Sequence, residues 1–440
     1  MDALIGVSPE NYVLPETITT DFEIENNDQT LTFIPPTNTE DVKSNSTFAL
    51  SSSSSSSYSS ADLIGEDLLT EILLLLPVIS LIRFTSTSKH WNSLIKSSSF
   101  SRLRNPNLDP PSGLFFEGWD SRSKYHYVPL DSVNPIHKPP FTTLGFDSGS
   151  IRILQSCNGL LLCRNDFQKH YVYNPTTNRF ATLPPHNNYN IPDTVCYMTL
   201  AFDPSKSCKY KVVCNYMHKA MMTEIYSSES GKWNNISNES MDDLVDIDND
   251  RGVYGHNAVH WMSFPNRLVY LKLEEEVVDY IDLDTPDTTV YGTILDEFLA
   301  ECCEGMLLVV RCCRFRRLNV YVIKKDYSEW GIKYHVDLEE VIRVYPNMVT
   351  RLGLHFVVQS LVVGEREEDS FVVMELPGKL IQYKFVANRR ILQLCDFSKK
   401  SHNQGGFFPK TIFQLSDFTP ENRRFINGSC FHFIPSLAAV

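Results

Sequence analysis

One pattern recurs five times between residues 160 and 400: an apolar segment, a turn, a segment that contains tyrosine, a second turn and a further strand-like segment. Each repeat can be aligned on one tyrosine, and the five are spaced by 53, 44, 51 and 62 residues: Tyr173, Tyr226, Tyr270, Tyr321 and Tyr383. Repeats of about 40 to 50 residues built from short strands are typical of β-propeller blades. The spacing therefore predicts a mainly-β, propeller-like domain with inserted loops.

Strand-like segments on both sides of the five repeats raise the expected number of blades to about six. Residues 112 to 150 contain GLFFEGW and KYHYVPL, and the end of the chain contains CFHFIPSL. These segments are candidates for strands that close a ring. Between the predicted strands lie turns such as Asn174-Pro175 and Pro377-Gly378, in which proline presets φ and glycine tolerates positive φ. A short helix is expected over 338–344.

Residues 62 to 106 follow a helical pattern instead. The apolar run ILLLLPVISLI is interrupted by Pro77 and bounded by Glu71 and Arg83, so it is too short for a membrane span, which needs about 18 to 20 apolar residues. The apolar side chains from Leu68 to Leu76 cover roughly 160° of a helix, whereas one core needs a stripe of about 100°. The width predicts that this helix contacts both the core of its own module and a partner.

Two more short helices are predicted after Pro77. The first carries Leu81 and Phe84, and the second begins near residues 86 to 88 and carries Trp91, Leu94 and Ile95 at spacings of three and four. A module of about 45 residues is close to the size at which a lone hydrophobic core is no longer sufficient. We therefore expect a three-helix module that depends on contacts beyond itself.

The negative charge of the chain is concentrated at its start. Residues 1 to 60 contain nine acidic residues and one basic residue, Lys43, and they end in SSSSSSSYSS. Such a tract buries too little apolar area to offset its ordering entropy, so it is expected to be a disordered tail. The one basic cluster, RCCRFRR from Arg311 to Arg317, is interleaved with apolar residues and favours a solvated strand edge. This charge distribution argues against a nucleic-acid partner, which requires a basic surface.

The eleven cysteines are expected to be reduced and buried, because the N-terminus has no features of a secretory signal and the cysteines lie in apolar, strand-like segments. A cytoplasmic or nuclear location follows as an expectation. No metal site or cofactor is predicted. The adjacent pairs Cys302-Cys303 and Cys312-Cys313 are the best metal candidates by composition, but neighbouring residues of a strand point to opposite faces. If His256 and His260 lie on one strand, their Cα atoms are about 13 Å apart, which is too far for both side chains to bind one ion.

The sequence contains no phosphate-binding G-x-x-x-x-G-K-[ST], H-E-x-x-H or G-x-S-x-G motif. Cys157-Asn158-Gly159 could suggest a nucleophile at a turn. A small buried thiol next to an Asn-Gly turn explains the same residues. The sequence therefore favours a protein that binds others over an enzyme, and a propeller hydrolase stays a third possibility.

Several ordered motifs resemble those of plant F-box proteins with a C-terminal F-box-associated, kelch-like domain. They are DLLTEILLLLPVISLIRFTSTSKHW from Asp67 to Trp91, then SCNGLL, YNPTTNRF, LAFDPS, EIYSSESGKW and GVYGHNAVHW. The match covers roughly residues 62 to 440. This chain departs from the family in having Ile64-Gly65 where Leu-Pro is usual, and Leu75 where a basic residue is usual, which makes the helix more apolar.

Beside the tail expected over 1–60, the resemblance implies a three-helix F-box over 61–106 and a propeller-like domain over 112–440. It also implies a non-catalytic substrate-recognition subunit of an SCF-type (Skp-cullin-F-box) ubiquitin ligase, in which the F-box binds a Skp-family adaptor and, through it, a cullin. The residues expected in or supporting the adaptor contact are Ile64, Leu68, Leu69, Ile72, Leu73, Leu76, Pro77, Leu81 and Trp91. About half of them could instead form only the internal core of the module.

The β domain is expected to bind a target protein, which the sequence does not identify. Candidate target-binding loops are polar and often acidic and lie at about 184 to 196, 238 to 251, 284 to 301 and 364 to 370. The alternative function is a propeller scaffold that binds a protein or carbohydrate without leading to degradation. Recovery of the adaptor and a cullin with the chain would separate the two.

Overall fold

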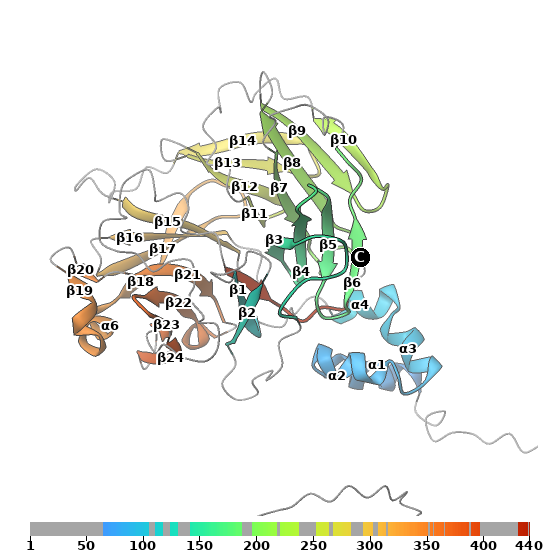
Figure 1. The fold of residues 1–440 in the computed structure, drawn as a ribbon, viewed down its shortest axis with the longest axis horizontal. Coiled ribbons are helices and arrows are strands. Elements are labelled where there is room, and N and C mark those ends of the chain that lie inside the picture. Colours follow the sequence, from blue (N-terminus) through green and yellow to red (C-terminus); the bar gives the residue numbers. More distant parts are fainter. Residues whose placement is uncertain are drawn as a thin grey trace, which may run out of the picture. The chain divides into compact units, whose positions relative to one another are not determined.

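A computed structural model of the 440-residue chain describes most of the sequence after residue 64. The described residues are 65–104, 111–117, 124–130, 141–186, 196–217, 221–236, 252–263, 267–282, 294–301, 307–313, 316–350, 353–354, 356–364, 366–386, 389–396, 430–438 and 440. The acidic tail predicted over 1–60 lies outside them. In the described part, four helices come first and antiparallel strands follow (Figure 1).

The helical module consists of α1 (Glu66–Leu74), α2 (Val78–Phe84), α3 (Lys89–Ile95) and α4 (Ser98–Arg104). Two acidic residues occupy the first turn of α1, where they stabilise the positive end of the helix dipole. Pro77 is the N-cap residue of α2, so α1 ends before it. Ser88 caps α3, because its hydroxyl accepts a 3.1 Å hydrogen bond from the Trp91 amide.

The helical module therefore holds four described helices, and the expectation of three is not confirmed. The additional helix, α4, begins after Ser97, whose hydroxyl accepts a 3.1 Å hydrogen bond from the Phe100 amide. Phe100 is 1% exposed and belongs to the core of the module. A serine cap followed by one apolar anchor is a short signal, and the sequence pattern alone did not separate it from a loop. None of the described helices is both long and apolar enough to cross a bilayer.

The described strands form five four-stranded antiparallel sheets, each a meander of consecutive strands. They are β3 (Ile151–Cys157), β4 (Leu160–Asn165), β5 (His170–Asn174), β6 (Arg179–Thr182); β7 (Cys196–Ala201), β8 (Lys211–Met217), β9 (Met221–Ser227), β10 (Lys232–Ile236); β11 (Val253–Gly255), β12 (Ala258–Ser263), β13 (Arg267–Lys272), β14 (Val277–Asp282); β15 (Ile294–Glu301), β16 (Leu307–Cys313), β17 (Arg317–Ile323), β18 (Trp330–Asp337); and β21 (Val357–Val362), β22 (Phe371–Leu376), β23 (Lys379–Lys384), β24 (Arg390–Asp396). Each sheet is one blade.

The five repeats of the sequence correspond to these five blades. Every alignment tyrosine lies on the third strand of its sheet and is at most 8% exposed. A tyrosine at this position covers apolar area between neighbouring sheets while its hydroxyl reaches a polar partner; the Tyr383 hydroxyl, for instance, donates to the Asp337 carbonyl at 2.9 Å. The predicted turns are also present, with φ of +75° at Gly378 between β22 and β23.

The two ends of the β region meet in one sheet. Strands β1 (Gly113–Glu117), β2 (Tyr125–Pro129) and β25 (Cys430–Phe433) form a three-stranded sheet in the order β2-β1-β25. Strand β25 lies beside β3 of the first blade, and the side chain of His432 reaches β21 of the fifth blade through a 2.6 Å hydrogen bond with Ser360. The prediction that these segments are strands that close the ring is thus confirmed.

The number of blades differs from the expectation. The described residues form five four-stranded blades, with neighbouring first strands in contact from β3 through β7, β11 and β15 to β21, so the count of about six is not confirmed. The helix expected over 338–344 is present as α6 (Glu339–Val344). It is followed by the short helical turns η2 (Pro346–Met348) and η3 (Glu367–Asp369) and by the two-stranded sheet of β19 (Val349–Thr350) and β20 (Gly353–Leu354).

Candidate functional site

Helix α1 exposes a stripe of three large apolar side chains. Leu68 is 53% exposed, Ile72 is 43% exposed and Leu75, the residue that caps the helix, is 86% exposed. Spacings of four and three residues place them on one face. We call these three residues the α1 stripe. Apolar anchors at i, i+4 and i+7 are what a helix offers to a hydrophobic groove in a partner protein.

The other face of α1 belongs to the core of the module. Leu69 and Leu73 are 3% and 0% exposed, and they pack in one cluster with Leu81, Ile95 and Phe100. Around this cluster, the rings of Phe84 and Trp91 approach to 5.1 Å between centroids. The 160° apolar arc is therefore divided between an internal core and an exposed surface, as its width predicted.

Two further contacts fix the end of α1. The guanidinium of Arg104 on α4 donates a 2.9 Å hydrogen bond to the Leu74 carbonyl, which is one of the carbonyls that the end of a helix leaves without an internal partner. The Leu75 amide donates to the Ile72 carbonyl at 3.3 Å. Because both contacts use the backbone, they position Leu75 without covering its side chain.

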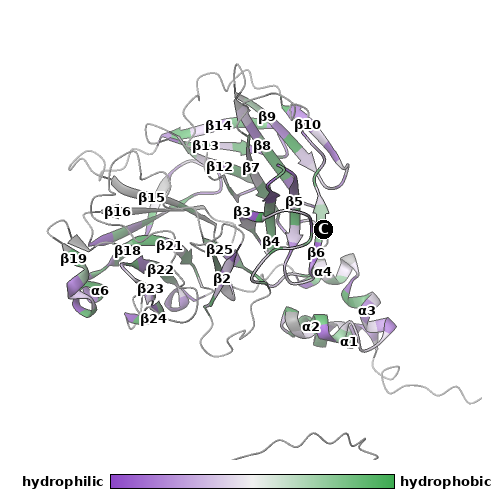
Figure 2. Cartoon of the chain, in the orientation of Figure 1, coloured by the Kyte–Doolittle hydropathy of each residue, from purple (hydrophilic) through white to green (hydrophobic). Residues whose placement is uncertain are grey.

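The nine predicted adaptor-contact residues separate into distinct groups. Leu68, Ile72 and Pro77 are exposed; Leu69, Leu73 and Leu81 are buried in the core; Leu76 and Trp91 are half-buried against that core; and Ile64 lies outside the described residues. The structure thus brings Leu68 and Ile72 together in the α1 stripe. The buried leucines support α1 from the core of the module. In Figure 2 the helices of this module carry both hydrophobic and hydrophilic residues.

Two large apolar residues that the helical module exposes were not among the nine predicted contact residues. Leu75 has the largest exposed fraction of the three in the α1 stripe, and the sequence signal for it was its fit to the anchor spacing. Leu103 is 60% exposed on α4; it was missed because α4 itself was not predicted. Polar residues border the stripe, since Glu66, Asp67 and Glu71 are all exposed. An apolar centre with a charged border is the usual arrangement of a protein interface.

The segment Cys157-Asn158-Gly159, which the sequence offered as a possible nucleophile at a turn, has a structural role. Cys157 is 1% exposed, and Asn158 and Gly159 have φ of +45° and +89° in the turn between β3 and β4. Positive φ at both central residues is typical of the tight turns that Asn-Gly forms in hairpins. The interpretation of a buried thiol beside an Asn-Gly turn is confirmed.

The prediction that His256 and His260 share one strand was wrong. His256 lies in the turn between β11 and β12 with φ of +51°, and His260 lies on β12. Their ring centroids are 6.4 Å apart. His260 is buried between the Val253 carbonyl at 3.2 Å and the Tyr327 hydroxyl at 3.0 Å, so its ring is engaged in packing between blades.

The candidate target-binding loops fall largely outside the described residues. The loop at 238 to 251 lies outside them, as do residues 187–195 of the first loop and residues 284–293 of the third. The loop at 364 to 370 is described except for residue 365. The loop predicted to extend to residue 301 was wrong in its second half, because Ile294–Glu301 forms the first strand of the fourth blade, β15. Of the adjacent cysteine pairs, Cys302-Cys303 lies outside the described residues, and Cys312-Cys313 ends β16.

Comparisons with known proteins agree with this division of the chain. Residues 62–103 match the model of the F-box domain, and residues 127–374 match the model of the F-box associated beta propeller domain. The F-box protein At5g07610 of Arabidopsis thaliana is 30% identical over 423 residues, which cover 88% of this chain and 94% of that protein. The F-box protein At5g49610 of the same plant is 28% identical over 247 residues, covering 52% of this chain and 66% of its own.

Among solved structures, TolB from Acinetobacter baumannii aligns with a TM-score of 0.38 and 8% identity over 68% of this chain and 67% of that one. The family assignment depends on the sequence matches, which span both the helical module and the blades. The described helices and sheets fall in the same two regions in the same order. The chain therefore belongs to the plant F-box proteins that carry an F-box associated β-propeller domain.

Proposed function

We propose that this chain is a substrate-recognition subunit of an SCF-type ubiquitin ligase, in which the F-box binds a Skp-family adaptor and the propeller binds a target protein. The observation that carries the proposal is the α1 stripe: three large apolar side chains exposed on a helix whose opposite face is already buried. An exposed apolar patch that is bordered by polar residues commonly marks a protein interaction site. The F-box match supplies the class of partner.

The contact is expected to be a helix-in-groove interface. Residues Leu68, Ile72 and Leu75 enter an apolar groove of the adaptor, and the exposed carboxylates beside them remain at the solvated edge. A stable interface of this kind buries about 1,600 Å² in total, more than three side chains provide. Pro77 and the exposed Leu103 are the residues that would extend it.

In this proposal the chain contributes no catalytic residue. The adaptor and a cullin bring the ubiquitin-loaded enzyme close, and the propeller holds the target so that its lysines come within reach. The propeller suits this role because short strands buried in five sheets form a rigid base for connecting loops, and loops on rigid bases commonly carry binding residues.

The test is affinity purification of the tagged full-length chain from plant cells, with mass spectrometry of what is recovered. The wild type is compared with Leu68→Ser/Ile72→Ser/Leu75→Ser and with the control Val277→Ser, which changes a 50% exposed apolar residue on β14. We expect a Skp adaptor and a cullin with the wild type and the control and neither with the triple variant. Recovery of neither protein with the wild type would favour a propeller scaffold that does not lead to degradation.

A further inference from the structure

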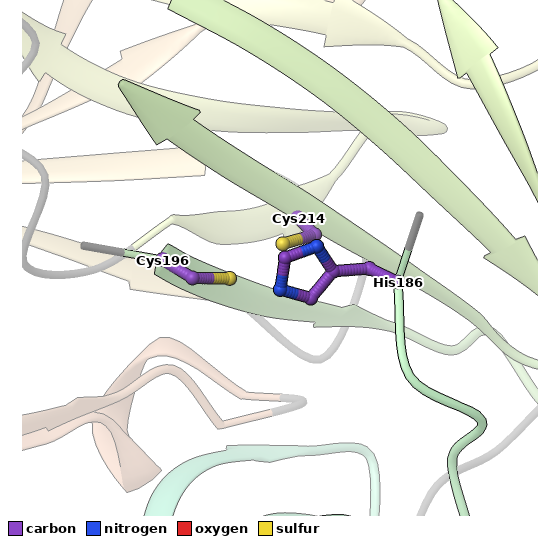
Figure 3. Close-up of side chains that lie close together, drawn as sticks. All are labelled: His186, Cys196 and Cys214. Atoms are coloured by element: carbon purple, nitrogen blue, oxygen red, sulfur yellow. The ribbon is translucent and has the colours of Figure 1, made fainter. Parts of the chain in front are cut away.

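Three side chains with metal-binding atoms converge in the second blade. They are His186, which follows β6, Cys196 at the start of β7 and Cys214 on β8. One ligand atom from each lies within 4.8 Å of the others. Figure 3 shows the two thiols and the imidazole pointing toward one another. The described residues contain one group of three or more such side chains that lie close enough to share an ion, and it is this one.

The strand register explains why the two cysteines meet. Cys196 is opposite Tyr216, and Cys214 is opposite Met198, so the two cysteines are diagonal neighbours on one face of the β7–β8 pair. Diagonal neighbours are typically about 7–8 Å apart, whereas disulfides need Cα atoms about 4.4–6.8 Å apart. The diagonal position therefore suits an ion between the two sulfurs better than a bond between them.

The position of His186 is fixed by the segment that precedes it. The Leu183 amide donates to the His170 carbonyl at 2.9 Å, and the indole N–H of Trp233 donates to the Pro184 carbonyl at 2.8 Å. His186 is 7% exposed, and its imidazole packs beside the ring of Tyr216, at 5.5 Å between centroids. Its metal-binding nitrogen is thus held over the sheet before an ion binds, which lowers the entropic cost of binding.

We propose that His186, Cys196 and Cys214 bind one Zn²⁺ ion, with a water molecule as the fourth ligand. Two thiolates and one imidazole form a donor set that selects zinc over magnesium or calcium. Zinc bonds of about 2.3 Å to sulfur and 2.0–2.1 Å to nitrogen need ligand atoms about 3.5–3.8 Å apart, which small side-chain rotations provide from the separation seen. Two thiolates neutralise the ion, so the burial of net charge is avoided.

The ion would join the segment after β6 of the first blade to β7 and β8 of the second. His186 and Cys196 also bracket nine residues of the candidate target-binding loop at 184 to 196, so the ion would fix both ends of that loop. An ion that binds the folded site and not the unfolded chain adds its binding free energy to the stability of the folded state. The zinc proposal is independent of whether the F-box binds an adaptor.

The experiment uses the full-length chain, purified under reducing conditions, incubated with zinc chloride and freed of excess metal. Bound zinc is measured by elemental analysis, and the absorption spectrum is recorded after substitution with Co²⁺. The variants are Cys196→Ser and Cys214→Ser. The matched control is Cys208→Ser, because Cys208 is a half-buried free cysteine between β7 and β8 that lies outside the cluster.

We expect about one zinc per chain for the wild type and Cys208→Ser, loss of zinc from both cluster variants, and a Co²⁺ spectrum with the thiolate charge-transfer and tetrahedral ligand-field bands. If a cluster variant fails to fold, the wild-type Co²⁺ spectrum decides. The proposal would be overturned by a wild-type chain that retains no zinc, by cluster variants that bind zinc like the wild type, or by a Cys196–Cys214 disulfide in the reduced preparation.

Discussion

Gly159 lies where the turn between β3 and β4 meets the C-terminal segment. Its φ is +89°, and a Cβ atom there would lie 2.4 Å from Cβ of Ser436 and 2.7 Å from the Ile434 carbonyl oxygen. Gly231 also has a positive φ, +68°, but nothing lies within 4 Å of its Cβ position. The two glycines therefore separate the cost of backbone strain from the cost of displacing the C-terminal segment.

We predict that Gly159→Ala destabilises the propeller more than Gly231→Ala. Both substitutions place alanine at positive φ, which costs on the order of 1–2 kcal/mol, and only the first adds a steric clash with backbone, worth roughly 1–3 kcal/mol more. The measurement is the urea midpoint of the propeller, followed by tryptophan fluorescence. Equal shifts for the two variants would mean that the C-terminal segment does not pack on this turn in solution.

His260 makes the propeller sensitive to acid. It is 0% exposed, and burial lowers its pKa from the ordinary 6.5 to about 3. Since the Val253 carbonyl can only accept, Nδ1 donates to it and Nε2 accepts from the Tyr327 hydroxyl, which describes a neutral ring. Below pH 6.5 this histidine binds a proton in the unfolded chain but stays neutral in the folded chain. The stability that the neutral buried ring contributes is therefore fully present above pH 6.5 and is lost as the pH falls toward 3.

We predict that His260→Gln lowers stability at pH 7.5 but makes it less dependent on pH between 6.5 and 4.5. The difference in slope should approach, at most, about 1.4 kcal/mol per pH unit. Urea denaturation across that range measures it, with His90→Gln as the control because His90 is exposed on α3. A variant that keeps the wild-type slope would show that His260 is already protonated in the folded state.

At the scale of single elements, α1 combines two roles that substitutions should separate. Leu73 is fully buried and Leu75 is 86% exposed, although they are two residues apart. Leu73→Ala leaves a cavity in a small core, with an expected loss of about 2–5 kcal/mol. Leu75→Ala should change stability by no more than about 0.5 kcal/mol. Hydrogen exchange of the amides of α1 and α3 in both variants tests the assignment, and faster exchange in Leu75→Ala would contradict it.

The sequence predicted the elements that depend on local pattern. Five tyrosines marked the third strands because each repeat buries the same position, and Ser88 and Pro77 marked helix boundaries through capping and the missing amide. Strand β15 was mistaken for part of a loop, because the acidic residues of ILDEFLAE lower its apparent strand propensity. The division of the leucines in α1 into core and surface was predicted in kind but not residue by residue.

The cluster of His186, Cys196 and Cys214 could not be predicted from the sequence. Its three residues are separated by 10 and 18 positions, which is not the short paired spacing of common zinc motifs. They meet because the register of β7 and β8 places the two cysteines diagonally and because Trp233 holds the segment before His186. Register depends on the pairing of whole strands, so the information is not local.

At the scale of the whole molecule, the chain combines a small helical module with an exposed apolar stripe and a larger domain of five blades. The larger domain has buried strands of its own in each sheet, whereas the helical module buries one cluster built around five residues. This difference in core size favours a module whose interface with a partner adds to its stability. The central claim is therefore that the α1 stripe binds a Skp-family adaptor.

The direct test is the dissociation constant between the purified chain and a purified plant Skp adaptor, measured by isothermal titration calorimetry. Wild type and Val277→Ser should bind with the same affinity. Leu68→Ser/Ile72→Ser/Leu75→Ser should bind at least about 100-fold more weakly, since roughly 1 kcal/mol or more is lost for each apolar anchor, while its circular dichroism stays unchanged. Binding of the folded triple variant with wild-type affinity would contradict the account.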